Sequence, residues 1–179
     1  MRILGIDPGS RATGYGIVDA GGDDRCVTRG VVRLDGDDDH PARLKQIYDA
    51  LTALIEEHEP ETFAIEMPVY GKNPQSMLKL GRAQAAAMMA ALNAGLDVAQ
   101  YTPKEVKKSV TGNGNASKTQ VGYMIGSILS LDADDLPHDA ADALAIALCH
   151  SNRDAHDDGG SYTGWASFVE SNPDRVSEQ

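Results

Sequence analysis

The sequence contains few of the residues that stabilise or anchor extracellular proteins. Only two cysteines, Cys26 and Cys149, occur in 179 residues, and they are too far apart to form a metal-type pair. We therefore expect two reduced thiols in the core. Aromatic residues make up only 5% of the chain against 41% hydrophobic residues, so the core must consist mainly of Ala, Val, Ile and Leu.

Long apolar segments are also missing. The longest weakly polar stretch, 83–96, is interrupted by Gln84 and Asn93 and is shorter than the ~20 residues of a membrane-spanning helix. The N-terminal segment has no basic region followed by an apolar core and a cleavage site, so we expect no export signal. These features predict a cytoplasmic protein that does not contact a membrane.

Positive charge is scarce overall but locally concentrated. A net charge of −11 argues against a general nucleic-acid-binding protein, because phosphate contacts require Lys and Arg. Residues 72–128, however, contain seven basic and two acidic residues, a net charge of +5 that leaves −16 for the rest of the chain. Acidic turns such as 19–24 and 35–39 are expected to form a solvated surface.

The order of apolar patterns predicts one α/β domain. Short apolar runs predict strands at about 2–6, 15–19, 26–34, 62–66 and 96–101, of which the first three are antiparallel. Helical spacing predicts helices at about 44–58, 74–93, 103–110, 118–130 and 139–150. We expect a mixed five-stranded sheet with helices on both faces over residues 1–151, followed by an acidic, flexible tail at 152–179.

Four carboxylates suggest a metal site. Asp7 follows a buried strand into a glycine-rich turn, Glu66 ends another strand, and Asp139 and Asp142 share one face of the last helix. An α/β packing could bring them to one point, where oxygen ligands suit Mg²⁺ or Mn²⁺ rather than zinc. Two such ions ~3.5–4 Å apart commonly assist the attack of water on a phosphodiester. The simpler alternative is three turn or capping aspartates and one solvated glutamate.

Nearby basic residues add to this pattern. His138 precedes Asp139 and could reach the site as a ligand or general base, although a helix cap is the simpler interpretation. The segment 112–119 is close to a Walker A loop, but Ser117 replaces the required second glycine. It fits better as a loop that presents Lys118 to a phosphate at a helix start. The remaining histidines are expected on the surface: His40, His58, His150 and His156.

Several motifs together resemble the RuvC family of Holliday-junction resolvases. They are Gly5-Ile-Asp-Pro-Gly-Ser-Arg11, Ala64-Ile-Glu66, Lys118 and Asp139-Ala-Ala-Asp-Ala-Leu-Ala-Ile-Ala147, in order along residues 1 to about 151. The resemblance implies a ribonuclease-H-like fold and a homodimer. It also implies a metal-dependent endonuclease that nicks two opposed strands of four-way junction DNA and works with a RuvA–RuvB branch-migration complex.

The resemblance also assigns roles to individual residues. Asp7, Glu66, Asp139 and Asp142 correspond to the metal-binding catalytic acids, with two Mg²⁺ per site and Mn²⁺ as a substitute. Tyr70 is the candidate for stacking against junction bases. The basic residues expected near the scissile phosphate or elsewhere on the DNA are Lys118, Lys107, Lys108, Lys72 and Arg82.

Three other functions stay open at this level. A catalytically silent junction scaffold would bind the same DNA, and a related nuclease could act on ribosomal RNA precursors. A sugar-kinase or actin-like ATPase would also use Asp7 and Gly9 followed by Thr13 and Gly14, although such proteins need two related domains. A metal-dependent nicking assay on a synthetic junction, with RNA as competitor, separates these possibilities.

Overall fold

The computed structural model describes residues 1–35, 38–68, 73–132 and 135–157. Five strands form one mixed sheet in the order β3-β2-β1-β4-β5. Strands β1, β2 and β3 are antiparallel, whereas β4 and β5 run parallel to β1. The strands are β1 (Arg2–Asp7), β2 (Ala12–Asp19), β3 (Arg25–Arg33), β4 (Thr62–Glu66) and β5 (Asp97–Tyr101), as the sequence predicts.

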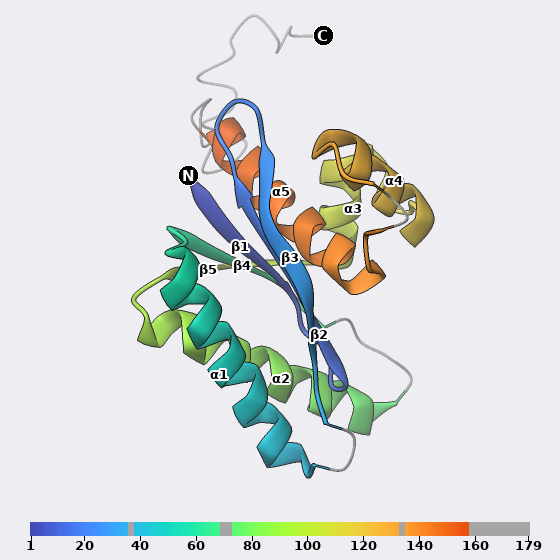
Figure 1. Ribbon diagram of the computed structural model, residues 1–179. Coiled ribbons are helices and arrows are strands. Elements are labelled where there is room, and N and C mark those ends of the chain that lie inside the picture. Colours follow the sequence, from blue (N-terminus) through green and yellow to red (C-terminus); the bar gives the residue numbers. More distant parts are fainter. Residues whose placement is uncertain (36–37, 69–72, 133–134, 158–179) are drawn as a thin grey trace, which may run out of the picture.

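Five helices cover the two faces of this sheet (Figure 1). Helices α1 and α2 lie on one face, and α3, α4 and α5 lie on the other. The helices are α1 (His40–His58), α2 (Pro74–Asn93), α3 (Pro103–Thr111), α4 (Lys118–Ile128) and α5 (His138–Asp157). All five predicted helices are confirmed, but α5 continues beyond its predicted end near His150. The domain boundary at 151 stays a prediction, and residues 158–179 lie outside the described part of the chain.

Side-chain hydrogen bonds set the starts of α3 and α4. Thr102 and Glu105 form a capping box, in which the Thr102 backbone N–H donates to the Glu105 carboxylate at 2.8 Å. Helix α3 ends at Gly112, whose φ of 73° suits glycine. Ser117 and Gln120 form a second capping box. These contacts make Lys118 the first residue of α4, as predicted.

Alternation along β1 divides the side chains between two cores. Leu4 and Ile6 belong to the cluster that α1 and α2 cover. Ile3 belongs to the cluster packed against α5. Asp7 has the same parity as Ile3 and therefore faces the α5 side of the sheet. The same alternation in β4 puts Glu66 on the α5 side, together with Ala64.

Glycines on this face allow α5 to approach the sheet backbone closely. A Cβ atom added at Gly5 would lie 2.2 Å from the Ala143 carbonyl oxygen, and one added at Gly14 would lie 2.0 Å from the Asp139 carbonyl oxygen. A Cβ added at Gly16 would lie 2.7 Å from the Leu144 side chain. No side chain fits at these three positions, so the glycines fix the height of α5 above β1 and β2.

One expectation about the interior is wrong. His150 was expected on the surface, but only 8% of it is exposed. Its Nδ1 lies 2.6 Å from the Tyr101 hydroxyl and its Nε2 lies 3.2 Å from the Thr62 hydroxyl. Partners on β4 and β5 therefore compensate for the burial of this polar ring.

Both cysteines are free, as the sequence predicts. Cys149 is buried and Cys26 is partly buried. Within the described ranges, no helix has both the length and the apolar character to cross a bilayer.

Substituting Gly5 by alanine should destabilise the protein by roughly 2–3 kcal/mol, because the new methyl group would overlap a backbone oxygen that cannot rotate away. In a chain of this size the melting temperature Tm should fall by roughly 5–10 °C, measured by circular dichroism. Gly81→Ala in α2 is the matched control, because a Cβ there meets nothing within 4 Å. The control should keep or raise Tm. Equal Tm values for the two variants would contradict the close approach of α5.

Candidate active site

Two carboxylates stand at neighbouring strand ends. Strands β1 and β4 pair in parallel with Gly5 opposite Ala64 and Ile6 opposite Ile65, so Asp7 and Glu66 follow next in the same register. Both residues face α5. Each strand is stopped by a nearby proline, Pro8 after β1 and Pro68 after β4, which cannot donate a ladder hydrogen bond. The carboxylates are therefore carried at fixed positions on the sheet.

The first two turns of α5 bring the other two acids to the same edge. The Asp139 backbone contacts Gly14, which is the cross-strand partner of Asp7. Asp142 follows three residues later and shares a cleft of about 160 Å³ with Asp7 and Glu66. The cleft is completed by Lys107 and Lys118 and by three apolar side chains, Pro103, Val106 and Val121. Three of the four predicted carboxylates thus line one cleft. Asp139 is not among the lining residues, but its charge acts on Asp7.

Burial and the negative charges of neighbouring acids raise the pKa of both strand-end acids. The pKa of Asp7 is raised from 3.8 to about 6, first by burial and then by the negative charges of Asp142 and Asp139. The pKa of Glu66 is raised from 4.5 to about 7 by burial and by the charges of Asp7 and Asp142. Lys118 opposes both shifts. The cleft therefore carries an excess of negative charge that a cation would relieve.

Lys118 supplies part of that positive charge. Its Nζ donates to Asp142 Oδ2 at 2.5 Å, and this hydrogen bond is the main reason why the pKa of Lys118 is raised. The lysine side chain is 68% exposed and that of Asp142 is 20% exposed, so the ammonium group bridges solvent and acids. Neighbouring aspartates on one helix face require a positive partner, and Lys118 provides it from α4.

The donor set suits a hard divalent cation. The four acids offer oxygen atoms alone, which Mg²⁺ and Mn²⁺ prefer. Among the described residues, no three His, Cys, Asp or Glu side chains are grouped closely enough to hold one ion. In this structure the acids therefore affect one another by their charges, but their oxygen atoms are not arranged as the ligands of a single ion. Their chemistry and excess negative charge fit the metal-binding role that the sequence suggests.

The other predicted site residues are distributed around this cleft. Lys107 lines it, but His138 lines an adjoining hollow with Lys118 and Tyr123. Arg82 is exposed on α2. Tyr70 and Lys72 lie outside the described residues. The predicted residues that line this cleft together are Asp7, Glu66, Asp142, Lys107 and Lys118.

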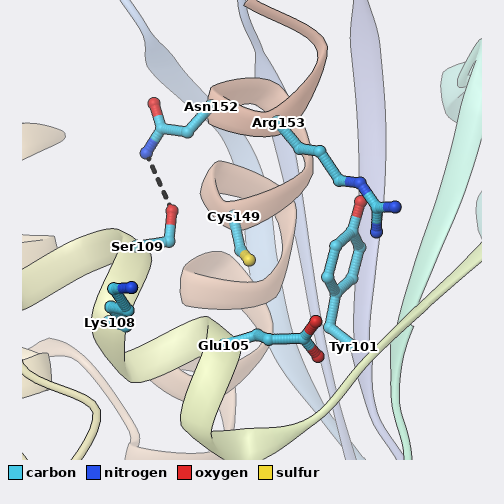
Figure 2. Close-up of a pocket in the computed structure, with 7 residues that line it drawn as sticks. All are labelled: Tyr101, Glu105, Lys108, Ser109, Cys149, Asn152 and Arg153. Carbon is cyan, nitrogen blue, oxygen red and sulfur yellow. Dashed lines mark hydrogen bonds between the residues drawn. The ribbon is translucent and has the colours of Figure 1, made fainter. Parts of the chain in front are cut away.

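Lys108 lies on another side of α3 from Lys107. Figure 2 shows it at the edge of a separate pocket of about 570 Å³, opposite Cys149 and Arg153 of α5. The Arg153 guanidinium lies 5.8 Å from the centre of the Tyr101 ring in this pocket. Helical geometry turns consecutive residues by about 100°, so the Lys107-Lys108 pair cannot face one site.

Sequence reasoning missed the apolar wall of the cleft. Pro103 and Val106 of α3 and Val121 of α4 line it beside the acids. Val106 and Val110 recur at a four-residue step, and this spacing could have identified the buried face of α3. The spacing does not reveal that this face closes a carboxylate cleft, because α3 is distant in sequence from β1 and α5.

Comparison with known proteins finds similarity along nearly the whole chain. The family model described as "Crossover junction endodeoxyribonuclease RuvC" matches residues 3–150. The protein of that description from Salinibacter ruber is 75% identical, over 99% of this chain and 100% of its own length. The one from Porphyromonas gingivalis is 46% identical, over 97% of this chain and 96% of its own length.

A solved structure gives the same result for the fold. The structure described as "T. thermophilus RuvC in complex with Holliday junction substrate" matches with a TM-score of 0.82 and 32% sequence identity. The match covers 88% of this chain and 96% of that chain. The expected ribonuclease-H-like sheet with helices on both faces is confirmed.

The raised pKa of Glu66 predicts a pH-dependent gain in stability for Glu66→Gln when divalent ions are absent. Because the folded-state pKa of about 7 lies above the ordinary 4.5, ionisation of Glu66 opposes folding. This cost is absent below pH 4.5, grows through pH 7 and is complete above it. At pH 8 in chelator, Gln should add roughly 1–3 kcal/mol and raise Tm by roughly 3–8 °C.

The gain should disappear at pH 4, where Glu66 is protonated in both states. Glu56→Gln, at an exposed glutamate of α1, is the control and should leave Tm unchanged at either pH. A Glu66→Gln variant with the same Tm as wild type at pH 8 would show that the carboxyl is not in a negatively charged, partly buried cleft.

Proposed function

The chain belongs to the RuvC family of crossover junction endodeoxyribonucleases, and we propose that its carboxylate cleft is where it cuts opposed strands of a four-way DNA junction. Resolution of Holliday junctions by a nuclease is the function that the family match supports. The observation that carries the assignment to this cleft is the meeting of Asp7, Glu66 and Asp142 with Lys118. Phosphodiester hydrolysis is very slow without such help.

Two divalent ions, Mg²⁺ by preference and Mn²⁺ as a substitute, would neutralise the reacting phosphate and activate the attacking water when bound. Asp7, Glu66, Asp139 and Asp142 would hold them. The sheet and α5 keep these acids in fixed positions, so little reorganisation accompanies each turnover. We expect the resulting nicks to carry 5′-phosphate and 3′-hydroxyl ends.

Lys118 and Lys107 have complementary tasks in this proposal. Lys118 contacts Asp142 and opposes the rise in the pKa of Asp7 and Glu66, so it favours the ionised form that binds a cation. Its exposed side chain can also meet a DNA phosphate at the mouth of the cleft. Lys107 lines the same cleft and lowers the pKa of Glu66. Further proposed DNA contacts are Lys108, Arg82, Tyr70 and Lys72.

Paired nicks on opposed strands require two active sites, which supports a homodimer. Helix α2 offers a surface for it, because its exposed apolar residues Leu78, Met89 and Leu92 are 56%, 48% and 52% exposed. Their spacing puts them on one face of the helix. We propose that the protein acts together with a RuvA–RuvB complex, and this proposal rests on family membership alone. The predicted nuclease domain spans 1–151 and the predicted tail 152–179, although residues 152–157 continue helix α5.

The other functions considered from the sequence lose their support. The family match over residues 3–150 is to an endonuclease that acts on crossover junctions, not to a kinase-like ATPase. A catalytically silent scaffold would not need partly buried acids whose negative charges repel one another in one cleft. The family model and the two relatives named above are described as nucleases of crossover junctions in DNA, not of RNA.

Asp7→Asn should abolish junction cleavage and leave junction binding intact, because it removes one charge from the metal site and leaves the basic surface in place. We expect a fall in nicking rate of at least roughly 10³-fold, a magnitude comparable to losing a principal catalytic group. The measurement is nicking of a labelled synthetic four-way junction with Mg²⁺, with Mn²⁺ and with chelator. Binding is measured in parallel by gel shift in chelator.

Asp49→Asn, at an exposed aspartate of α1 that pairs with Lys45, is the matched control and should cleave as wild type does. Wild-type-like cleavage by Asp7→Asn, or wild-type cleavage that persists in chelator, would refute the proposed mechanism. Loss of binding together with cleavage would instead assign Asp7 a structural role.

A further inference from the structure

A second hollow adjoins the acid cleft along α4. It encloses about 210 Å³, and we call it the α4–α5 hollow. The residues that line it are Lys118, Thr119, Gly122, Tyr123, Leu136, His138 and Ala141. Lys118 belongs to both the hollow and the acid cleft, so the two spaces share one wall. A strand whose phosphate meets Lys118 therefore has a neighbouring space for its next nucleotide.

Tyr123 is the most unusual residue in this wall. It is 72% exposed, the largest exposure among the large hydrophobic side chains of the described chain. Thr119 lies one helical turn before it and lines the same hollow. A ring left in solvent beside a DNA-cutting site has the properties of a stacking platform for a base, because every base offers a π-face.

The charge of the hollow also suits DNA. Lys118 and His138 are its basic lining residues, and none of the lining residues in the described part of the chain is Asp or Glu. This contrasts with the acid cleft beside it and with the net charge of −11 for the whole chain. An anionic strand is therefore repelled less here than on most of the surface.

Gly122 keeps one side of the hollow open. It lines the hollow, and a Cβ added there would meet nothing within 4 Å. Thr119 supplies a hydroxyl and His138 a ring nitrogen for hydrogen bonds to base edges. Apolar contacts come from Leu136 and Ala141. The combination of a π-face, a few polar atoms and an apolar floor is the chemistry that recognises a nucleobase.

On the basis of the proposed function, we propose that the α4–α5 hollow receives one unpaired base of the junction strand beside the scissile phosphate, stacked on Tyr123. Because Lys118 lines both spaces, a nucleotide whose phosphate contacts Lys118 has the adjoining hollow beside it. A branch point supplies bases that are already unstacked, which reduces the cost of extruding one. Tyr123 is thus a substrate-binding residue and His138 contacts DNA there.

A double-mutant cycle, in which one change is in the protein and the other is an abasic nucleotide in the DNA, tests this contact. Tyr123→Ala should lower kcat/KM for the junction by roughly ten-fold, the scale of one lost base stack. Wild type should show a similar loss when an abasic residue replaces one particular nucleotide within three positions of the nick. With that abasic junction, Tyr123→Ala should show no further loss. Tyr123→Phe should recover at least half of the loss caused by alanine.

The control for this cycle is Ile128→Ala, at an exposed residue near the end of the same helix that lines neither space. It should retain both the wild-type rate and the wild-type response to abasic DNA. If the losses from Tyr123→Ala and from every abasic position simply multiply, the ring does not stack on a base and the proposal is overturned.

Filling the hollow gives an independent test. Gly122→Leu should lower cleavage by at least ten-fold while Tm stays equal or rises, because leucine is a better helix former and the new side chain meets no protein atom at its Cβ. Ser127→Leu, at an exposed site on α4, is the control and should cleave normally. Normal cleavage by Gly122→Leu would overturn the proposal. A wild-type protein that does not nick junctions would instead contradict the proposed function.

Discussion

The close contact between α5 and the glycine-lined face of the sheet is the constraint on which this structure depends. Gly5, Gly14 and Gly16 leave no side chain between the helix and the two strands. The first turn of α5 consequently meets the end of β1, where Asp7 leaves the sheet. Any side chain at these glycines would lift the helix and separate the helix acids from the strand acids. The packing of small residues thus determines the electrostatics of the cleft.

The electrostatic interactions in the cleft destabilise the folded chain when no cation is bound. Burial and neighbouring carboxylates raise the pKa of Asp7 and Glu66, and Lys118 compensates only in part. A protein selected for stability alone would replace such acids by neutral groups. Their convergence is therefore better explained by a cation and a phosphate that bind there. A chain with a net charge of −11 nevertheless places four lysines on α3 and α4, and two of them, Lys107 and Lys118, line this cleft.

Much of this arrangement follows from local sequence patterns. Asp7 and Glu66 each end a short apolar strand, and Asp139 and Asp142 share a helix face, so their proximity could be predicted from strand ends and helical spacing. The burial of His150 could not, because Tyr101 and Thr62 are its partners and neither is near in sequence. The end of α5 was also missed, since polar residues after His150 hide the continuation of the helix. The hollow beside Tyr123 depends on how α4 meets α5, which no local pattern specifies.

We propose that Asp7, Glu66, Asp139 and Asp142, which come from three distant parts of the chain, surround one ion-binding site. Backbone cleavage by Fe²⁺ bound in place of Mg²⁺ tests it most directly, because hydroxyl radicals produced with ascorbate and peroxide cut only the chain near the ion. We expect cuts near residues 7, 66 and 139–142, all suppressed by excess Mg²⁺. Cuts confined to one of these segments, or cuts that Mg²⁺ does not suppress, would contradict it.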